Sequence, residues 1–326
     1  MNMLKDQFGR TIDYMRISVT DRCNLRCRYC MPRGIERVPM AEILSYEEIA
    51  FVCTQAAALG IDRFRITGGE PLVRKNCTTL VSMLKRIPQV RQVALTTNGV
   101  LLAEHLDGLL DAGLDAVNIS LDTTDREQYQ AITGMDELER VMASVRLAAG
   151  KLPVKINCVV QRGVNEDAPA PLAALARDLP VDVRFIELMP IGAAKNMQTM
   201  PNPEVLGMIE ERFGETEADP GPRGSGPAVY RRLKGFSGRI GFISAIHGKF
   251  CGTCNRLRLT STGELKPCLC YGDRVPLREI LRDGAEDKAE RIRERILEAV
   301  RIKPAAHCFD DREKITENRE MARIGG

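Results

Sequence analysis

The stretch "RISVTDRCNLRCRYCMP" (residues 16–32) joins a strand-like run to three closely spaced cysteines. Cys23, Cys27 and Cys30 follow the pattern C-x3-C-x2-C. A structural zinc site needs four ligands, and so does an ordinary ferredoxin-type cluster. Three thiols in one short loop therefore predict a metal centre with one coordination position left open, where chemistry can occur.

Further strand-like runs follow, and helical patterns lie between them. The strands are expected at 16–19, 64–67, 92–96, 116–120, 154–160 and 183–188, and the helices at 45–59, 77–86, 101–111, 138–149 and 168–177. Ser45 and Glu48 have the spacing of a capping box. Alternating strands and helices predict β-α units and a parallel sheet. Six such units fall short of a closed eight-stranded barrel.

Chemically distinctive motifs follow most of these strands. The cysteine loop follows the first, and "GGEP", "TNG", "LDTT" and "MPIG" follow the second, third, fourth and sixth. Ligands of parallel α/β folds bind at the carboxyl ends of the strands, where such loops gather. Their shared position predicts one site.

The composition changes at "DPGPRGSGP" (219–227), which has the Pro, Gly and Ser content of a linker or surface loop. We therefore expect two regions, 1–218 and 219–326. The second holds short strand patterns at 229–233, 239–244 and 256–260, and a charged helix at 288–303 with an apolar stripe. It also holds a second cysteine set, "CGTCNRLR" followed by "KPCLC".

The bulk properties restrict the setting. The 326 residues carry 47 Lys and Arg against 44 Asp and Glu, a net charge of +3 that gives no case for a bulk nucleic-acid binder. No apolar run has the length of a membrane span, and no signal or transit pattern opens the chain. With 11 cysteines, an odd number, we expect a cytoplasmic protein whose close cysteines bind metal instead of forming disulfides.

The cysteine loop resembles that of the radical S-adenosylmethionine superfamily. Tyr29 precedes the third cysteine, and "GGEP" (68–71) closes the second strand-like run, as in that superfamily. The resemblance implies a [4Fe-4S] cluster on Cys23, Cys27 and Cys30, with S-adenosylmethionine on the fourth iron. Gly68 and Gly69 lack Cβ atoms, so we expect the backbone to approach this ligand closely, with Glu70 near its ammonium group.

The second cysteine set has two interpretations. Cys251, Cys254 and Cys268 form another three-thiol set, which suits a second cluster with an open iron. Cys270 offers a fourth ligand, so the spacing also suits a zinc ribbon. Arg256 and Arg258 would share one face of a strand, and two guanidinium groups beside a metal centre favour an anionic substrate.

Longer motifs are similar to one family within that superfamily, the GTP 3′,8-cyclases of molybdenum cofactor biosynthesis. These are "FGRTIDYMRISVTDRCNLRCRYCMP", "RITGGEPLVR", "LTTNG", "NISLD", "ELMPIG", "CGTCNRLRLT" and the terminal "MARIGG". The resemblance implies an incomplete (β/α)6 TIM-type barrel whose open side is closed by the C-terminal region. It also implies that a 5′-deoxyadenosyl radical abstracts the 3′ hydrogen of GTP and that C3′ joins guanine C8, giving (8S)-3′,8-cyclo-7,8-dihydroguanosine 5′-triphosphate.

The family motifs imply the site residues, and no side chain is assigned to catalysis. Those expected to contact S-adenosylmethionine are Tyr29, Gly69, Ser120 and Met189. Those expected to contact GTP are Arg16, Arg65, Thr96, Lys155, Arg256, Leu257 and Arg258, with Arg184 a weaker candidate. The ligands of two [4Fe-4S] clusters are Cys23, Cys27 and Cys30 and, in the second set, Cys251, Cys254 and Cys268. Cys270 and Cys308 are additional to the family pattern.

The resemblance also implies partners. These are GTP, an external electron donor and a cyclic pyranopterin monophosphate synthase that takes the product, with a homodimer possible and no nucleic acid or membrane. Met321 and Ile324 are expected to dock the terminal Gly325 and Gly326 in the active site. Two alternatives remain: a peptide-modifying radical S-adenosylmethionine enzyme with an auxiliary cluster, and a non-enzymatic zinc-binding or carrier protein.

Overall fold

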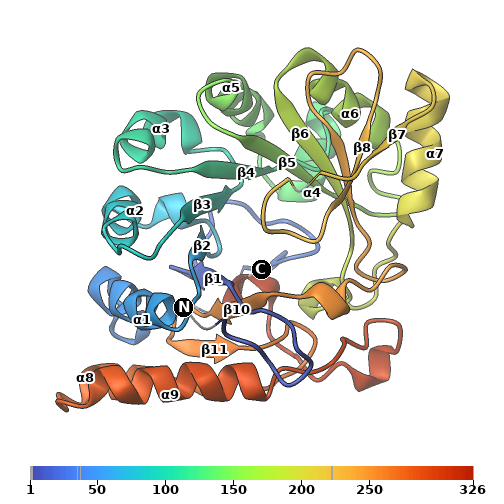
Figure 1. The fold of residues 1–326 in the computed structure, drawn as a ribbon. Helices are drawn as coiled ribbons and strands as arrows, with labels where there is room; N and C mark the ends of the chain where they lie inside the picture. Colours follow the sequence, from blue (N-terminus) through green and yellow to red (C-terminus); the bar gives the residue numbers. More distant parts are fainter. Residues whose placement is uncertain (1–2, 35, 37, 222, 326) are drawn as a thin grey trace.

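The fold is built around one large, mostly parallel sheet (Figure 1). The computed structural model describes residues 3–34, 36, 38–221 and 223–325. Six parallel neighbours form the centre of the sheet, in chain order: β1 (Tyr14–Ser18), β2 (Arg63–Thr67), β3 (Gln92–Thr97), β4 (Ala116–Ser120), β5 (Val154–Val160) and β6 (Val181–Glu187). They lie within two residues of the runs predicted from sequence.

The C-terminal region adds strands to both edges of this centre. β10 (Arg256–Leu259) pairs in parallel with β1, and β9 (Ile240–Ile243) pairs in parallel with β6. The outermost strands complete a sheet of 12, with β11 (Glu264–Lys266) and β12 (Val275–Pro276) beyond β10, and β8 (Val229–Arg232) and β7 (Glu217–Asp219) beyond β9. In the described part of the chain no ladder joins β12 to β7. The predicted incomplete barrel is confirmed.

Helices cover the outer face of the sheet (Figure 1). They are α1 (Tyr46–Ala58), α2 (Cys77–Lys85), α3 (Leu102–Asp111), α4 (Arg126–Thr133), α5 (Leu138–Ala148), α6 (Pro169–Asp178), α7 (Asn202–Phe213), α8 (Arg278–Arg282) and α9 (Lys288–Arg301). The predicted capping box starts α1: Ser45 Oγ accepts from the Glu48 amide at 3.1 Å, and Glu48 Oε2 accepts from the Ser45 amide at 2.7 Å. The sequence patterns missed α4, α7 and α8.

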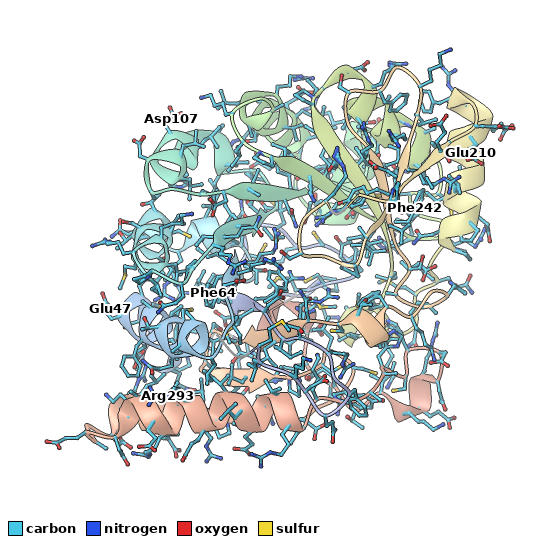
Figure 2. The ribbon with its side chains drawn as sticks, in the orientation of Figure 1. Glu47, Phe64, Asp107, Glu210, Phe242 and Arg293 are labelled. Carbon is cyan, nitrogen blue, oxygen red and sulfur yellow. The ribbon has the colours of Figure 1, made fainter. Side chains whose placement is uncertain are left out.

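The strands alternate between a face packed on the helices and a face turned to the interior of the barrel. In β2, Phe64 and Ile66 are buried in the main core, whereas Arg63 and Arg65 are only partly buried. Figure 2 shows Phe64 inside the molecule, with Glu47 and Asp107 on the outer sides of helices. Because side chains alternate along a strand, the apolar half of each strand fixes which residues face inward.

The long helix α9 packs its apolar stripe against the rest of the protein. Ile292, Ile296 and Val300 are buried, as the sequence predicts, and α9 lies beside α1. Among the charged positions between them, Glu294 is exposed, whereas Arg293 Nη1 donates to Gln55 Oε1 of α1 at 2.7 Å. None of the described helices combines the length and apolar character that a membrane crossing requires.

We expect Gly238→Ala to destabilise the junction between β9 and the central strands. A Cβ at residue 238 would lie 1.7 Å from the carbonyl oxygen of Val181, at the start of β6. The backbone must move, at a cost of about 3 kcal/mol in the free energy of unfolding. Denaturant unfolding measures this loss.

The matched control is Gly207→Ala in the exposed face of α7, where an added Cβ meets nothing within 4 Å. It should stabilise the protein by up to about 1 kcal/mol, because alanine favours helix more than glycine does. Equal stability of the two variants would contradict the packing described at Gly238.

Candidate active site

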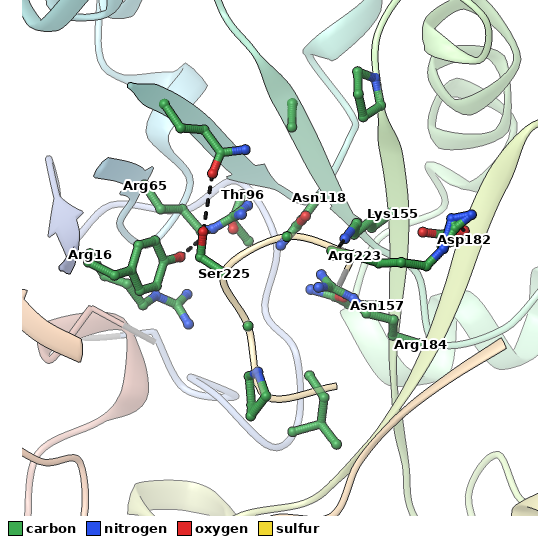
Figure 3. Close-up of a pocket in the computed structure, with 18 of the residues that line it drawn as sticks. Arg16, Arg65, Thr96, Asn118, Lys155, Asn157, Asp182, Arg184, Arg223 and Ser225 are labelled. Carbon is green, nitrogen blue, oxygen red and sulfur yellow. Dashed lines mark hydrogen bonds and ion pairs between the residues drawn. The ribbon is translucent and has the colours of Figure 1, made fainter. Parts of the chain in front are cut away.

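A pocket of about 390 Å³ lies inside the barrel, on the inward face of the strands. Figure 3 shows basic and amide side chains converging on it from different strands. Its lining from the central strands is Tyr14, Arg16, Arg65, Gln92, Thr96, Ala116, Asn118, Lys155, Asn157, Asp182, Arg184 and Ile186, with Arg256 from β10. Within each strand these residues are two or four positions apart, so the alternation of the sheet places them on the same face.

The pocket is strongly cationic. Burial, together with the neighbouring Arg65, Arg256 and Arg184, lowers the pKa of Arg16 to about 10 against the opposing effect of Tyr14. Arg65 Nε donates to Tyr14 Oη at 2.5 Å, and Arg184 Nε donates to Asn157 Oδ1 at 2.8 Å. Buried like charges repel, and an anion in the pocket would relieve that repulsion.

On β3 and β4, the pocket wall has two buried polar oxygen atoms without a hydrogen bond to any described residue. They are Thr96 Oγ1 and Asn118 Oδ1, which lie side by side in register on β3 and β4. A buried polar atom without a partner costs free energy. Both atoms therefore fit a polar ligand in the pocket.

The cysteine loop follows β1 at the carboxyl end of the sheet and is held by backbone bonds. Arg26 and Arg28 donate their amides to Thr133 and Ile132 of α4, at 2.7 and 2.9 Å. Cys23, Cys27 and Cys30 are free thiols, and each is partly buried. Burial raises the pKa of Cys27, and Asp122, Cys30 and Cys23 contribute to the increase.

The glycines of "GGEP" pack directly against the backbone of the cysteine loop. The Gly69 amide donates to the Thr20 carbonyl at 2.7 Å, and a Cβ on Gly69 would lie 2.3 Å from the Arg22 carbonyl oxygen. The close approach expected toward a ligand is therefore also an approach to the cysteine loop. Any larger residue at 69 would displace the loop.

Glu70 is held by hydrogen bonds from the neighbouring loops. Its buried carboxylate accepts from the Leu72 amide at 3.0 Å, the Thr97 hydroxyl at 2.8 Å and the Asn98 amide at 2.7 Å. Burial raises the pKa of Glu70 to about 7, although these hydrogen bonds lower it. Glu70 thus joins "GGEP" to "TNG" and positions the backbone.

Tyr29 links the cysteine loop to the end of β4. Its hydroxyl donates to Asp122 Oδ2 at 2.8 Å, and Asp122 Oδ1 accepts from the Val159 amide at 2.8 Å. Ser120, at the end of β4, is partly buried, and Met189 packs on a small core beside the C-terminal tail. These expected contacts for S-adenosylmethionine come from three strand ends on the same side of the sheet.

The second cysteine set lies at the opposite end, where β10 begins. Cys251 and Cys254 belong to one short turn, with the Cys254 amide donating to the Cys251 carbonyl at 3.1 Å, and Cys268 follows β11. Lys303 Nζ donates to the carbonyls of Arg256 at 2.9 Å and Pro267 at 2.7 Å. Cys251, Cys254 and Cys268 are free thiols, each partly buried.

The charge around Cys254 favours a thiolate. Burial raises the pKa of its thiol, but Arg256 and Lys303 beside it lower the pKa to about 7. Iron-sulfur clusters bind cysteine as thiolate. The charge around Cys254 thus fits iron-sulfur ligation in the second set. The described residues hold no group of three Cys, His, Asp or Glu arranged around a single metal ion.

Cys270, the possible fourth ligand, lies against Cys308. The two thiols are 3.0 Å apart, and the Cys308 amide donates to Cys270 Sγ at 3.3 Å. Cys270 is fully buried, in the small core that also contains Phe309 and Ile324. The two cysteines that are additional to the family pattern therefore form a contact with each other.

The tail is docked as predicted, up to the last described residue. Ile324 is fully buried, Met321 packs beside it, and Arg258 Nη1 donates to the Gly325 carbonyl at 2.6 Å. Gly325 has φ of +74°, which glycine adopts without strain. Gly326 lies outside the described residues. Figure 1 places this end of the chain near β1 and β10.

The structure brings most of the predicted GTP residues together. Arg16, Arg65, Thr96, Lys155 and Arg256 line the pocket, as does the weaker candidate Arg184. Arg258 points inward beside Arg16 but is hydrogen-bonded to the tail, and Leu257 is buried on the helix side of β10.

The sequence patterns did not indicate Tyr14, Asn118 and Asn157 as pocket residues. Because side chains alternate along a strand, Arg16 and Lys155 would have indicated Tyr14 and Asn157, two positions away. The patterns also did not indicate residues 223–227, which line one wall.

Two sequence families match consecutive parts of the chain. The radical SAM superfamily matches residues 17–176, and the family described as Molybdenum Cofactor Synthesis C matches residues 181–309.

Among solved structures, SuiB of Streptococcus suis bound to S-adenosylmethionine has a TM-score of 0.63 at 15% identity, covering 88% of this chain and 69% of that one. Native anSMEcpe with bound AdoMet has a TM-score of 0.57 at 17% identity, covering 85% of this chain and 82% of that one. The fold and the cysteine loop are those of a radical S-adenosylmethionine enzyme.

Relatives at much higher identity define the family. A GTP 3′,8-cyclase of Pelotomaculum thermopropionicum is 44% identical over 329 residues, covering 99% of this chain and 100% of the relative. Another from Heliobacterium modesticaldum is 46% identical over 328 residues, covering 98% and 99%. The chain belongs to the GTP 3′,8-cyclase family.

We expect Cys254 in metal-free protein to react with iodoacetamide along a pH profile centred near its lowered pKa of about 7. Below that pH the thiol is protonated and slow, and above it the thiolate reacts. Arg256→Gln removes the main lowering charge, so the midpoint should move upward. Peptide mass spectrometry after timed alkylation measures the rate.

The control for this measurement is Arg232→Gln, which removes an exposed arginine of β8. The control should leave the midpoint where it is. A midpoint that Arg256→Gln leaves unchanged would contradict the electrostatic account of Cys254.

Proposed function

We propose that this protein is a GTP 3′,8-cyclase that carries out the first step of molybdenum cofactor biosynthesis, with GTP bound in the cationic pocket. The observation that carries the proposal is the position of that pocket. It lies inside the barrel, lined by Arg16, Arg65, Lys155 and Arg184, between a three-cysteine loop at one end of the strands and a second cysteine set at the other. Such a place suits a polyanionic substrate that two metal centres approach from opposite sides.

The bound groups supply the reactivity, and the chain supplies the geometry. Cys23, Cys27 and Cys30 would hold a cluster on which bound S-adenosylmethionine, once reduced by one electron, would supply the 5′-deoxyadenosyl radical that takes the 3′ hydrogen of GTP. Bonding of C3′ to guanine C8 would be completed by a second electron and a proton. Tyr29, Gly69, Ser120 and Met189 would hold S-adenosylmethionine. Cys251, Cys254 and Cys268 would hold the second cluster, which would supply a binding position for the purine edge.

The pocket residues fix the nucleotide so that C3′ and C8 are close before the radical forms. Arg16, Arg65, Lys155 and Arg256 neutralise the triphosphate, and Thr96 offers its unpaired hydroxyl. Arg258 acts indirectly, because it donates a hydrogen bond to the carbonyl of Gly325 in the tail. The buried Leu257 stabilises the positions of Arg256 and Arg258 by its packing. Fixing two reacting atoms in this way lowers the entropic part of the barrier.

The remaining partners follow from the proposed reaction. An external donor supplies the electrons that the reaction consumes, and a cyclic pyranopterin monophosphate synthase takes the cyclised nucleotide. We place the protein in the cytoplasm, acting without nucleic acid or membrane, as a monomer or homodimer. The two regions have different roles. Region 1–218 holds the S-adenosylmethionine site, and region 219–326 holds the second cluster and the tail.

Substituting one ligand in each cysteine set tests the two-cluster assignment. Cys27→Ser should abolish 5′-deoxyadenosine formation, because its cluster would lose a ligand. Cys254→Ser should lower the iron content by about half, on a model of two four-iron clusters. It should keep some cleavage of S-adenosylmethionine but give no cyclised nucleotide. Anaerobic reconstitution, metal analysis and mass spectrometry of the reaction measure all of these.

Two results would contradict this assignment. One is Cys27→Ser protein that cleaves S-adenosylmethionine at the parent rate. The other is zinc, in place of iron, in the second set of the parent protein. Protection from proteolysis by GTP, with no protection by peptides, would separate the cyclase from a peptide-modifying enzyme.

The tail gives a separate prediction. One residue appended after Gly326, or Gly326→Ala, should suppress GTP cyclisation with both clusters and the fold intact, because added bulk would displace a segment docked through Ile324 and Gly325. Product mass spectrometry and iron analysis on the same sample measure the effect. Undiminished cyclisation by the extended chain would show that the tail has no such role.

A further inference from the structure

A segment that resembles a linker in sequence crosses the pocket in the structure. Residues 223–227, here called the strap, lie between β7 and β8, at one end of the sheet. Ser225 Oγ donates to Gln92 Oε1 of β3 at 3.3 Å, and Asn255 Nδ2, just before β10, donates to the Ser225 carbonyl at 3.5 Å. The strap thus reaches from the β8 end of the sheet toward the β10 end and closes one wall of the pocket (Figure 3).

The strap contacts a residue expected to bind GTP. Lys155 Nζ donates to the carbonyl oxygen of Arg223, and also to Tyr230 Oη at 3.2 Å. Both acceptors are neutral, and among the described residues no carboxylate is hydrogen-bonded to this ammonium group. Burial lowers the pKa of Lys155 to about 8, with Arg184 adding to the effect and the nearby Asp182 opposing it. A phosphate oxygen would be a stronger acceptor for this ammonium than a peptide carbonyl.

The Arg223 side chain is held by two long ion pairs and by the Tyr230 ring, whose centroid lies 6.0 Å from Arg223 Cζ. Its nearest carboxylates are Asp182, at 3.8 Å from Nη1, and Asp219, at 3.7 Å from Nε, both beyond hydrogen-bond distance. Arg223 Nε is buried and has no hydrogen-bond partner in the described chain. Because Arg223 lines the pocket, its guanidinium is placed to bond an oxyanion there.

Glycine is required next to Arg223. Gly224 has φ of +100°, and a Cβ there would lie 3.1 Å from Lys155 Nζ. A side chain at 224 would strain the backbone and push the ammonium group. Gly221 offers a comparison in the same segment, since its φ is not positive and its Cβ would meet only Asp219 Oδ1, at 3.6 Å.

The placement of the other groups indicates which part of GTP meets the strap. If the purine faces the second cysteine set beside β10 and the ribose faces the cysteine loop after β1, the phosphates extend across the sheet toward β5 and β6. There Lys155, Arg184 and Arg223 meet. This step rests on the proposed function.

We propose that the strap recognises the terminal phosphate of GTP: Lys155 exchanges the Arg223 carbonyl for a phosphate oxygen, and the Arg223 guanidinium binds the same phosphate. The strap then determines selectivity for a nucleoside triphosphate over the diphosphate. Arg223 is a specificity residue in this scheme and takes no part in the radical reaction.

The test compares GTP and GDP binding by the full-length, cluster-loaded protein under anaerobic conditions, using equilibrium dialysis. The parent should prefer GTP. Arg223→Gln should weaken GTP binding by about tenfold, the size expected for one charge-assisted hydrogen bond, and change GDP binding little. Gly224→Ala should also reduce the preference, by displacing Lys155. Gly221→Ala and Arg232→Gln are the controls and should keep it.

Two further readouts exclude a general loss of folding. In the cyclisation assay, Arg223→Gln should raise KM for GTP and leave kcat nearly unchanged. Trypsin cleavage after Arg223 in the parent should be slowed by GTP more than by GDP, because the triphosphate holds the strap.

The outcomes separate the strap from the proposed function. A parent protein that binds no GTP would overturn both. A parent that binds GTP, with an Arg223→Gln variant that keeps the full preference for GTP or loses GTP and GDP affinity equally, would overturn the strap inference and leave the cyclase assignment standing.

Discussion

Strict alternation of side chains along the parallel strands is the constraint on which the site depends. One face of each central strand must be apolar, because helices cover it, and this leaves only every second residue free to carry chemistry. Arg16, Arg65, Thr96, Lys155 and Arg184 all occupy such inward positions. A register shift of one residue in any strand would exchange its pocket residues for core residues, so the packing under the helices and the chemistry of the pocket are specified together.

The same arrangement concentrates positive charge where water is scarce. Arg16 lies near Arg65, Arg184 and Arg256, and burial with mutual repulsion lowers its pKa. Tyr14, Asn157 and the backbone relieve part of this cost through hydrogen bonds to the guanidinium groups. The cavity is therefore less stable empty than an apolar one of equal size, and an anionic ligand stabilises it. Affinity for a polyanion is built into the unliganded fold.

Local patterns predicted much of this architecture. The six central strands and the helix capped by Ser45 follow from alternation and capping chemistry, and the cysteine sets follow from spacing. What the sequence could not reveal depends on distant partners. The segment at 223–227 has the composition of a linker, and its role arises from contacts with Gln92, 133 positions away, and with Asn255. The carboxylate of Glu70 accepts hydrogen bonds from Leu72, Thr97 and Asn98, and the spacing of "GGEP" alone does not indicate these donors. Such contacts exist only after the chain has folded.

The parallel pairing of β1 with β10 has a consequence for synthesis. Asp13 and Asn255, which flank the starts of these strands, are hydrogen-bonded across 242 positions. A ribosome adds about 5–20 residues per second, so on the order of ten to fifty seconds pass between the synthesis of β1 and the synthesis of its neighbour β10. During that time one edge of β1 has unpaired N–H and C=O groups, which favour pairing with other nascent chains. A transcript broken shortly before the codon for Arg256 would release a chain with most of the barrel and this edge exposed. Cells that make the protein therefore need to shield the nascent chain, or to degrade such fragments, before the last quarter of the sequence is translated.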